Sequence, residues 1–151
     1  MKKIFPILSV AVVVFLVLAI IQFRKSNSSS KVVIDDHQIN VWVARSNQEL
    51  SRGLGGVAQM DENQGMIFIF AQHDTRPSFW MKDMLIPLDM IWINDNKVTQ
   101  IHKDVPPPQS PTDNLPLYTP DQPIDYVLEV NAGFSDRNGI EVGDSVEMIG
   151  I

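Results

Sequence analysis

The 151-residue sequence contains no cysteine. This absence excludes a disulfide framework, a thiolate metal site and a thiol nucleophile. The three histidines, His37, His73 and His102, are far apart and form no zinc-binding pattern such as H-x-x-x-H. The sequence also has no P-loop and no G-x-G-x-x-G segment that would indicate nucleotide binding. We therefore expect neither a metal ion nor a cofactor.

Basic residues are scarce after the first part of the chain. Five of the twelve lysines and arginines lie at or before Lys31, and beyond it seven basic and eighteen acidic residues give a net charge of −11. Nucleic-acid affinity depends on lysines and arginines that neutralise phosphates, so a nucleic acid is not expected as a partner. An anionic lipid surface is disfavoured for this part of the chain for the same reason.

Charge is also missing from residues 4–23, which form a nearly continuous aliphatic run. A helix of about 20 residues matches the roughly 30 Å hydrocarbon core of a bilayer. The run is longer than the apolar region of a cleaved signal peptide and lacks a small-residue pair at its end, although residues 28–30 offer a weak cleavage site. The sequence favours an uncleaved signal-anchor over residues 1–25 with the lipid bilayer as partner of residues 4–23, and leaves cleavage as the alternative.

The domain organisation follows from this segment. Residues 26–31, rich in serine, predict a flexible tether, and residues 32–151 predict one globular domain. A short basic amino terminus before a first span usually stays in the cytoplasm, although Arg24 and Lys25 make the charge comparison close. The expected location is therefore the cell membrane, as a single-pass protein with its domain on the outer face.

Short apolar segments separated by turn residues predict a β-rich domain. Alternating or branched stretches predict strands in residues 65–71, 79–82, 88–94, 98–103 and 125–130, a strand pair or one bent strand in 32–44, and a last strand after a turn at Gly143-Asp144 within 140–149. Residues 94–97 form a hairpin turn signal. A capping box of Ser46 and Glu49 predicts a short helix in residues 46–52, and Asn131 can cap a second one in residues 132–138. Seven prolines in residues 105–123 predict a long surface loop. The predicted fold class is α+β: a compact, mostly antiparallel, barrel-like β domain with two short helices, preceded by a transmembrane helix.

The order of several motifs resembles the domain of unknown function 192 (DUF 192) family over residues 39–148. These motifs are Arg-Gly-Leu at 52–54, Gly-Met-Ile-Phe-Ile-Phe at 65–70, Phe-Trp-Met-Lys-Asp at 79–83, Ile-Pro-Leu-Asp at 86–89, Tyr-Val-Leu-Glu-Val-Asn-Ala-Gly at 126–133 and Gly-Ile-x-x-Gly-Asp at 139–144. Two positions depart from the family pattern, because Asp83 stands where asparagine is usual and Gly55 where methionine is usual. The resemblance implies a small mixed domain that is often exported or membrane-anchored, and it implies no established activity.

Five residues are candidates for a ligand-binding site: Trp80, Lys82, Asp83, Asp89 and Glu129. Lys82 alternates with apolar neighbours beside Trp80, so its ammonium group can form a cation–π contact or bind a ligand. The competing interpretation is a structural ion pair of Lys82 with Asp89, Glu129 or Asp144. Asp89 and Glu129 would also supply two carboxylates for acid–base chemistry if they lay close together. No catalytic residue is identified.

Three functions remain open. The first is a non-enzymatic binding or accessory module of the cell envelope, with a small polar or carbohydrate ligand in a cleft bordered by Trp80, Lys82, Asp89 and the proline-rich loop. The second is a small hydrolase that acts on an envelope or carbohydrate substrate through Asp89 or Glu129. The third is a structural partner of another envelope protein, which an exposed apolar patch on the loop would favour. We favour the first, and the sequence does not fix the oligomeric state.

Overall fold

The computed structural model describes residues 30–110 and 114–151. The predicted anchor, residues 1–25, and residues 26–29 of the predicted tether lie outside the described residues. Within the described part, no helix has both the length and the apolar character needed to cross a bilayer.

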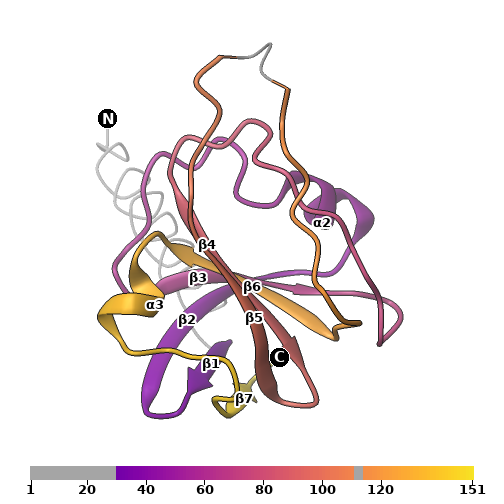
Figure 1. The fold of residues 1–151 in the computed structure, drawn as a ribbon, viewed down its shortest axis with the longest axis vertical. Coiled ribbons are helices and arrows are strands. Elements are labelled where there is room, and N and C mark those ends of the chain that lie inside the picture. Colours follow the sequence, from indigo (N-terminus) through magenta and orange to yellow (C-terminus); the bar gives the residue numbers. More distant parts are fainter. Residues whose placement is uncertain (1–29, 111–113) are drawn as a thin grey trace, which may run out of the picture.

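Seven strands form a single sheet in the order β5-β4-β6-β3-β2-β1-β7 (Figure 1). Every neighbouring pair is antiparallel except β2 and β3, which are parallel. The strands are β1 (Lys31–Ile34), β2 (His37–Ala44), β3 (Gln64–Ile69), β4 (Leu88–Asn94), β5 (Lys97–Val105), β6 (Tyr126–Asn131) and β7 (Val146–Ile149). The two helices in the described residues are α2 (Asn47–Arg52) and α3 (Phe134–Arg137).

The two outer strands of the sheet meet at one end. A bridge joins Lys97 to Ser145, the amide of Val98 donates to the carbonyl of Asp144 at 3.0 Å, and the amide of Gly143 donates to the carbonyl of Val98 at 2.8 Å. These bonds curl the sheet into a half-barrel. The expected α+β class, with a mostly antiparallel sheet and two short helices, is confirmed.

Local sequence signals explain the connections that shape the half-barrel. Asp95 and Asn96 both adopt positive φ angles, 48° and 57°, as the tight hairpin between β4 and β5 requires. Ser46 and Glu49 form the expected capping box at the start of α2. Parallel strands cannot be joined by a hairpin, and α2 lies in the long crossover that connects β2 to β3.

The sheet separates two hydrophobic clusters because side chains alternate between its faces. The pair Ile91 and Leu128 lies on one face, in a cluster that includes Phe134 of α3. The pair Trp92 and Val127 lies on the other face, in a cluster covered by Leu54, Met81 and Met84 from segments outside the sheet. Both faces of the central strands are therefore buried.

Two local predictions were wrong. Residues 79–82 form no strand, and their only pairing with described residues is an isolated bridge between Phe79 and Tyr118. Pro116 and Pro120 flank Tyr118 and cannot donate hydrogen bonds, so the pairing does not extend into a ladder. The second helix begins at Phe134 after Gly133, rather than being capped by Asn131, because Gly133 adopts a left-handed conformation at the helix start.

Candidate functional site

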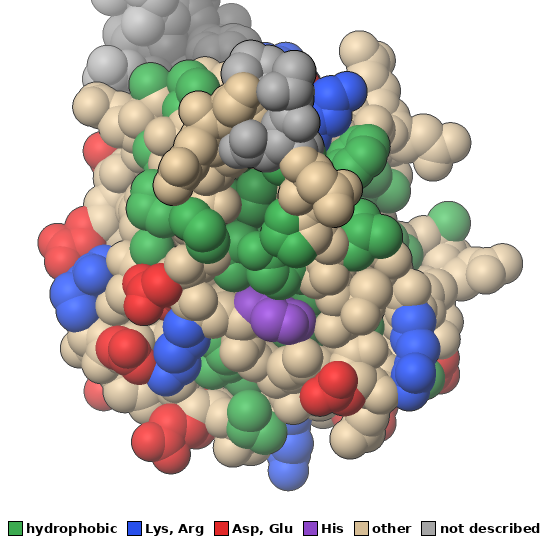
Figure 2. Space-filling model, turned by 45° about the horizontal axis from the view of Figure 1, so that its top comes forward, with side chains coloured by type: hydrophobic (Ala, Val, Ile, Leu, Met, Phe, Trp, Pro, Cys, Tyr) green, Lys and Arg blue, Asp and Glu red, His purple; other side chains and the backbone are tan. Residues whose placement is uncertain are grey.

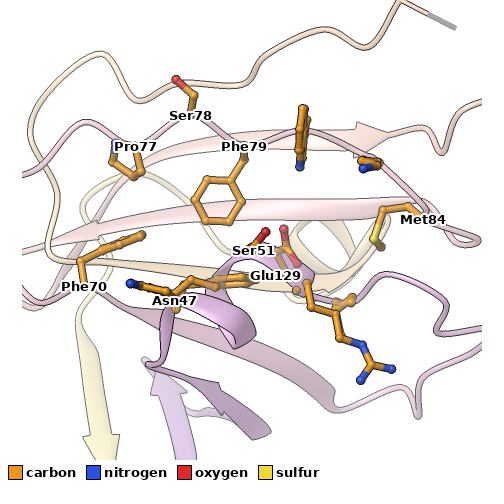
Figure 3. A pocket seen from close by; sticks show the side chains of 15 residues that line it. Asn47, Ser51, Phe70, Pro77, Ser78, Phe79, Met84 and Glu129 are labelled. Carbon is orange, nitrogen blue, oxygen red and sulfur yellow. The ribbon is translucent and has the colours of Figure 1, made fainter. Parts of the chain in front are cut away.

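A pocket of about 390 Å³ opens on the sheet face that carries Trp92 and Val127 (Figure 3). Its floor comes from β3 and β6, one wall from α2 and the residues after it, and the other wall from residues 77–84 before β4. Its lining residues are Asn47, Leu50, Ser51, Arg52, Gly53, Leu54, Phe68, Phe70, Pro77, Ser78, Phe79, Trp80, Lys82, Met84 and Glu129.

The α2 wall is positioned by its amino-terminal cap. The hydroxyl of Ser46 accepts from the amide of Glu49, while the Glu49 carboxylate accepts from the amides of Arg45 and Ser46 at 3.0 and 2.9 Å. Asn47 and Ser51 are four residues apart on the helix and so lie on one face. Figure 3 shows the Ser51 hydroxyl turned toward the same space as the Glu129 carboxyl, and both residues line the pocket.

The opposite wall is built around the ring of Phe79. This ring makes edge-on contacts with Phe68 and Trp92, with centroids 4.9 and 5.5 Å apart, and a longer one with Phe70 at 6.4 Å. The backbones of Phe79 and Tyr118 exchange two hydrogen bonds of 2.8 Å, which fix the wall to the proline-rich loop. The pocket thus offers aromatic surface in a fixed position.

Glu129 is the unusual residue of the pocket. It is only 4% exposed, and its side chain forms no hydrogen bond or ion pair with any described residue. Its strand partners are Met66 on β3 and Met90 on β4, so its cross-strand neighbours are apolar. Burial raises the pKa of Glu129 to about 8, and the carboxyl group is therefore protonated at neutral pH.

The backbone at Glu129 is held close to β3 by a glycine. A Cβ atom added at Gly65 would lie 2.6 Å from the carbonyl oxygen of Glu129. Any larger residue at position 65 would push the two strands apart. This close approach fixes the strand that carries the buried carboxyl group.

Asp89 lies on the opposite face of the sheet from Glu129. Glu129 pairs directly with Met90, the residue after Asp89, and successive side chains on a strand point to opposite faces. Asp89 is fully buried and accepts three backbone hydrogen bonds, from Asp104 at 2.9 Å, Gly133 at 3.1 Å and Ser135 at 2.9 Å. The structure thus places Asp89 where it holds β5 and the start of α3 to β4, away from the lining of the pocket.

Lys82 and Trp80 meet at the edge of the pocket. The Lys82 ammonium lies 5.7 Å from the centroid of the Trp80 ring, which is 51% exposed. The predicted ion pair of Lys82 with Asp89, Glu129 or Asp144 is absent from the described part of the chain. Asp89 already accepts backbone amides, and Asp144 accepts from the amide of Glu141 at 2.7 Å.

Asp83 is not among the described residues that line this pocket. It is exposed, has a φ of 58°, and lines a separate hollow with Lys82, Leu85 and the loop residues Pro108 and Leu115. Three of the five predicted site residues, Trp80, Lys82 and Glu129, are thus brought together, and Asp83 and Asp89 are not.

The sequence reasoning missed the polar residues of the walls. Asn47, Ser51 and Ser78 line the pocket beside Glu129. The spacing of Asn47 and Ser51 within a helix predicted from its capping box was a usable signal that they share a face. No local signal indicated that this face covers β6.

Comparison with known proteins identifies the class. Residues 30–148 match the DUF192 family, whose description is "Uncharacterized ACR". The chain belongs to this family, as its motif order indicated.

Solved structures agree in fold. A candidate transcription regulator from Sinorhizobium meliloti 1021 is 29% identical, with a TM-score of 0.69, over 80% of this chain and 92% of that one. A protein of unknown function from Novosphingobium aromaticivorans DSM 12444 is 30% identical, also with a TM-score of 0.69, over 79% of this chain and 83% of that one. No curated protein matches the chain.

Proposed function

We propose that this protein is a membrane-tethered binding module on the outer face of the cytoplasmic membrane, and that its pocket holds a small polar ligand of the carbohydrate class. The uncharged run of residues 4–23 supports the anchor. The DUF192 domain then carries the pocket, and the binding event needs no cofactor.

The observation that carries the proposal is the unpartnered carboxyl group of Glu129 on the pocket floor. A nearly buried carboxyl group that has no partner in the protein is free to form hydrogen bonds with a molecule in the pocket. A protonated carboxyl can both donate and accept a hydrogen bond, as a sugar hydroxyl does. The aromatic wall of Phe79, Phe70 and Trp80 adds flat apolar surface for the ring of a sugar.

The geometry favours binding over hydrolysis. Hydrolysis of a glycosidic bond usually requires two carboxyl groups on either side of that bond. Among the described residues, Glu129 is the only acid that lines the pocket, and Asp89 lies across the sheet. The pair proposed as a catalytic dyad is therefore not assembled at this pocket.

A glycan-array screen of the full-length protein in detergent, followed by isothermal titration calorimetry with free sugars, tests the proposal. We expect at least one glycan to bind and the variant Glu129→Leu to abolish that binding, since leucine can neither donate nor accept. Glu129→Gln should retain most of the affinity because the amide is also both donor and acceptor. Glu147→Leu, an exposed acid on β7, is the matched control. Failure of every glycan to bind would refute the proposal.

A second candidate function is docking onto another envelope protein. Three large apolar side chains near the proline-rich loop are exposed, Trp80, Leu85 and Leu117, the last by 61%. Figure 2 shows hydrophobic side chains gathered near the described part of this loop, while most of the charged side chains in view lie elsewhere on the same face. An exposed apolar patch of this kind is typical of an interaction surface.

Site-specific photo-crosslinking in intact cells tests this second candidate. A crosslinker at position 117 should give a discrete adduct, whereas one at Val142, equally exposed at 64% but in the turn before β7, should not. Equal labelling at both positions, or none at position 117, would count against a docking surface.

A further inference from the structure

The charge of the pocket is opposite to that of the rest of the domain. Beyond Lys31 the chain carries seven basic and eighteen acidic residues. Two of those basic residues, Arg52 and Lys82, line the pocket, and Glu129 is the only acid to do so in the part of the chain that the structure describes. Since Glu129 is neutral at pH 7, the pocket is a positively charged site in a strongly negative domain.

The two cations are available to a ligand. Neither the Arg52 nor the Lys82 side chain forms a hydrogen bond or an ion pair with a described residue, and both are exposed. Lys103, by contrast, pairs with Asp136. The ammonium of Lys82 is held near the Trp80 ring, so it lies beside the aromatic surface that a ligand ring would cover.

From this arrangement we propose that the ligand is an acidic monosaccharide of the hexuronic acid class, with its hydroxyl groups on Glu129 and Ser51 and its carboxylate on Lys82. This inference rests on the proposed function and adds the charge of the ligand to it. A neutral hexose would leave Lys82 unused, and an amino sugar would be repelled by both cations. An anion without hydroxyl groups would leave the buried Glu129 carboxyl unpartnered.

The geometry divides the recognition into two parts. The floor carries the nearly buried, neutral carboxyl group of Glu129, and it selects for hydroxyl groups through hydrogen bonds. The edge is charged and exposed, and it selects for a carboxylate through an interaction that salt weakens. Loss of the hydrogen bonds at the floor should abolish binding of all sugars. Loss of the positive charge at the edge should remove only the preference for an acidic sugar.

Three matched sugars test the inference by calorimetry on the full-length protein in detergent at pH 7: glucuronate, glucose and glucosamine. We expect glucuronate to bind roughly tenfold more tightly than glucose, as one exposed charge-assisted hydrogen bond provides, and glucosamine to bind most weakly. Lys82→Met should lower glucuronate affinity by roughly tenfold and change glucose affinity by less than about twofold. Lys97→Met, which removes an exposed lysine outside the pocket lining, is the control and should change neither.

The outcomes separate this inference from the proposed function. Equal affinity for glucuronate and glucose, or a Lys82→Met variant that still prefers glucuronate, would overturn the acidic ligand and leave a carbohydrate site in place. Binding of none of the three sugars would overturn the acidic ligand, and a glycan array that is also blank would overturn the proposed function with it. A glucuronate preference that disappears in Lys82→Met and weakens with added salt would support the inference.

Discussion

Asp89 and Glu129 are two buried acids on neighbouring strands with opposite surroundings. Asp89 accepts three backbone amides from segments that are distant in sequence, and Glu129 accepts none. A carboxylate that receives several amide hydrogen bonds stabilises the fold around it. A carboxyl that receives none opposes folding in its charged form, so its place in a pocket supports the proposed binding role rather than a role in the fold.

Removal of Asp89 should have the largest effect on stability. Asp89→Ala leaves three buried amides without an acceptor, and we expect the free energy of unfolding to fall by about 5 kcal/mol. Asp89→Asn keeps one acceptor oxygen and should lose about half as much, which keeps the measurement possible if the alanine variant does not fold. Urea unfolding followed by tryptophan fluorescence measures both. A loss below about 1 kcal/mol in unfolding free energy for Asp89→Asn would mean that Asp89 does not stabilise the fold more than Glu129 does.

Neutralisation of Glu129 should change the pH dependence of stability. Its folded pKa of about 8 lies above its ordinary value of 4.5, so between these values the folded state holds a proton that the unfolded state releases. The contribution of Glu129 to the unfolding free energy is therefore fully present below pH 4.5 and is lost as the pH rises toward 8. Relative to Glu129→Gln, the native protein should lose about 2 to 3 kcal/mol between pH 5 and pH 7.

Urea unfolding at the two pH values checks this difference. Glu147→Gln, at an exposed position on β7, should follow the native protein and serves as the control. Parallel curves for the native protein and Glu129→Gln would mean that Glu129 is ionised or partnered in the folded state.

Removal of the α2 cap should affect only the sheet face that carries Glu129, because α2 forms a wall of the pocket on that face. Ser46→Ala loses the hydroxyl that accepts the amide of Glu49, and we expect a loss of about 1 kcal/mol in unfolding free energy. Because Asn47 and Ser51 lie on this helix, sugar binding should weaken as well. Calorimetry and urea unfolding measure the two effects, with Ser145→Ala as the control outside the pocket lining. Normal binding by a destabilised Ser46→Ala variant would show that the α2 wall is dispensable.

Lys82→Met should have the smallest effect on stability. The ammonium is exposed and has no ion pair among the described residues, so we expect a change below about 0.5 kcal/mol. A thermal melt of each protein measures it. If Lys82 formed a buried structural ion pair, its removal would lower the unfolding free energy by about 3 to 5 kcal/mol. A loss of that size would show that Lys82 stabilises the fold.

Signals within a few residues of each other predicted much of the fold. The capping box predicted α2, and the turn signal at Asn94–Lys97 predicted the hairpin of β4 and β5. The pattern of residues 79–82 predicted a strand, and the structure keeps its alternation, with Met81 buried and Trp80 and Lys82 exposed. Pairing fails there because the opposing segment carries prolines, a property of residues nearly forty positions away.

The roles of the charged residues depend on contacts that are distant in sequence. The amides that bind Asp89 lie 15, 44 and 46 residues away, so its sequence neighbours gave no indication of them. The separation of Asp89 and Glu129 follows from the register of β4 and β6, in which Met90 rather than Asp89 faces Glu129. A shift of one residue would have placed both acids on one face, and composition alone cannot distinguish the two registers.

The junction of the sheet edges at Lys97 and Ser145 bears on how the protein behaves in concentrated solution. Unpaired edge strands are templates for aggregation, and natural sheets shorten or cover them. Here β7 has only four residues, and the far side of β5 is approached by the proline-rich loop, where the amide of Asp121 donates to the Gln100 side chain at 2.7 Å. The same loop that borders the candidate site thus leaves little free edge for another chain to extend, which should keep the domain dispersed at high protein concentration.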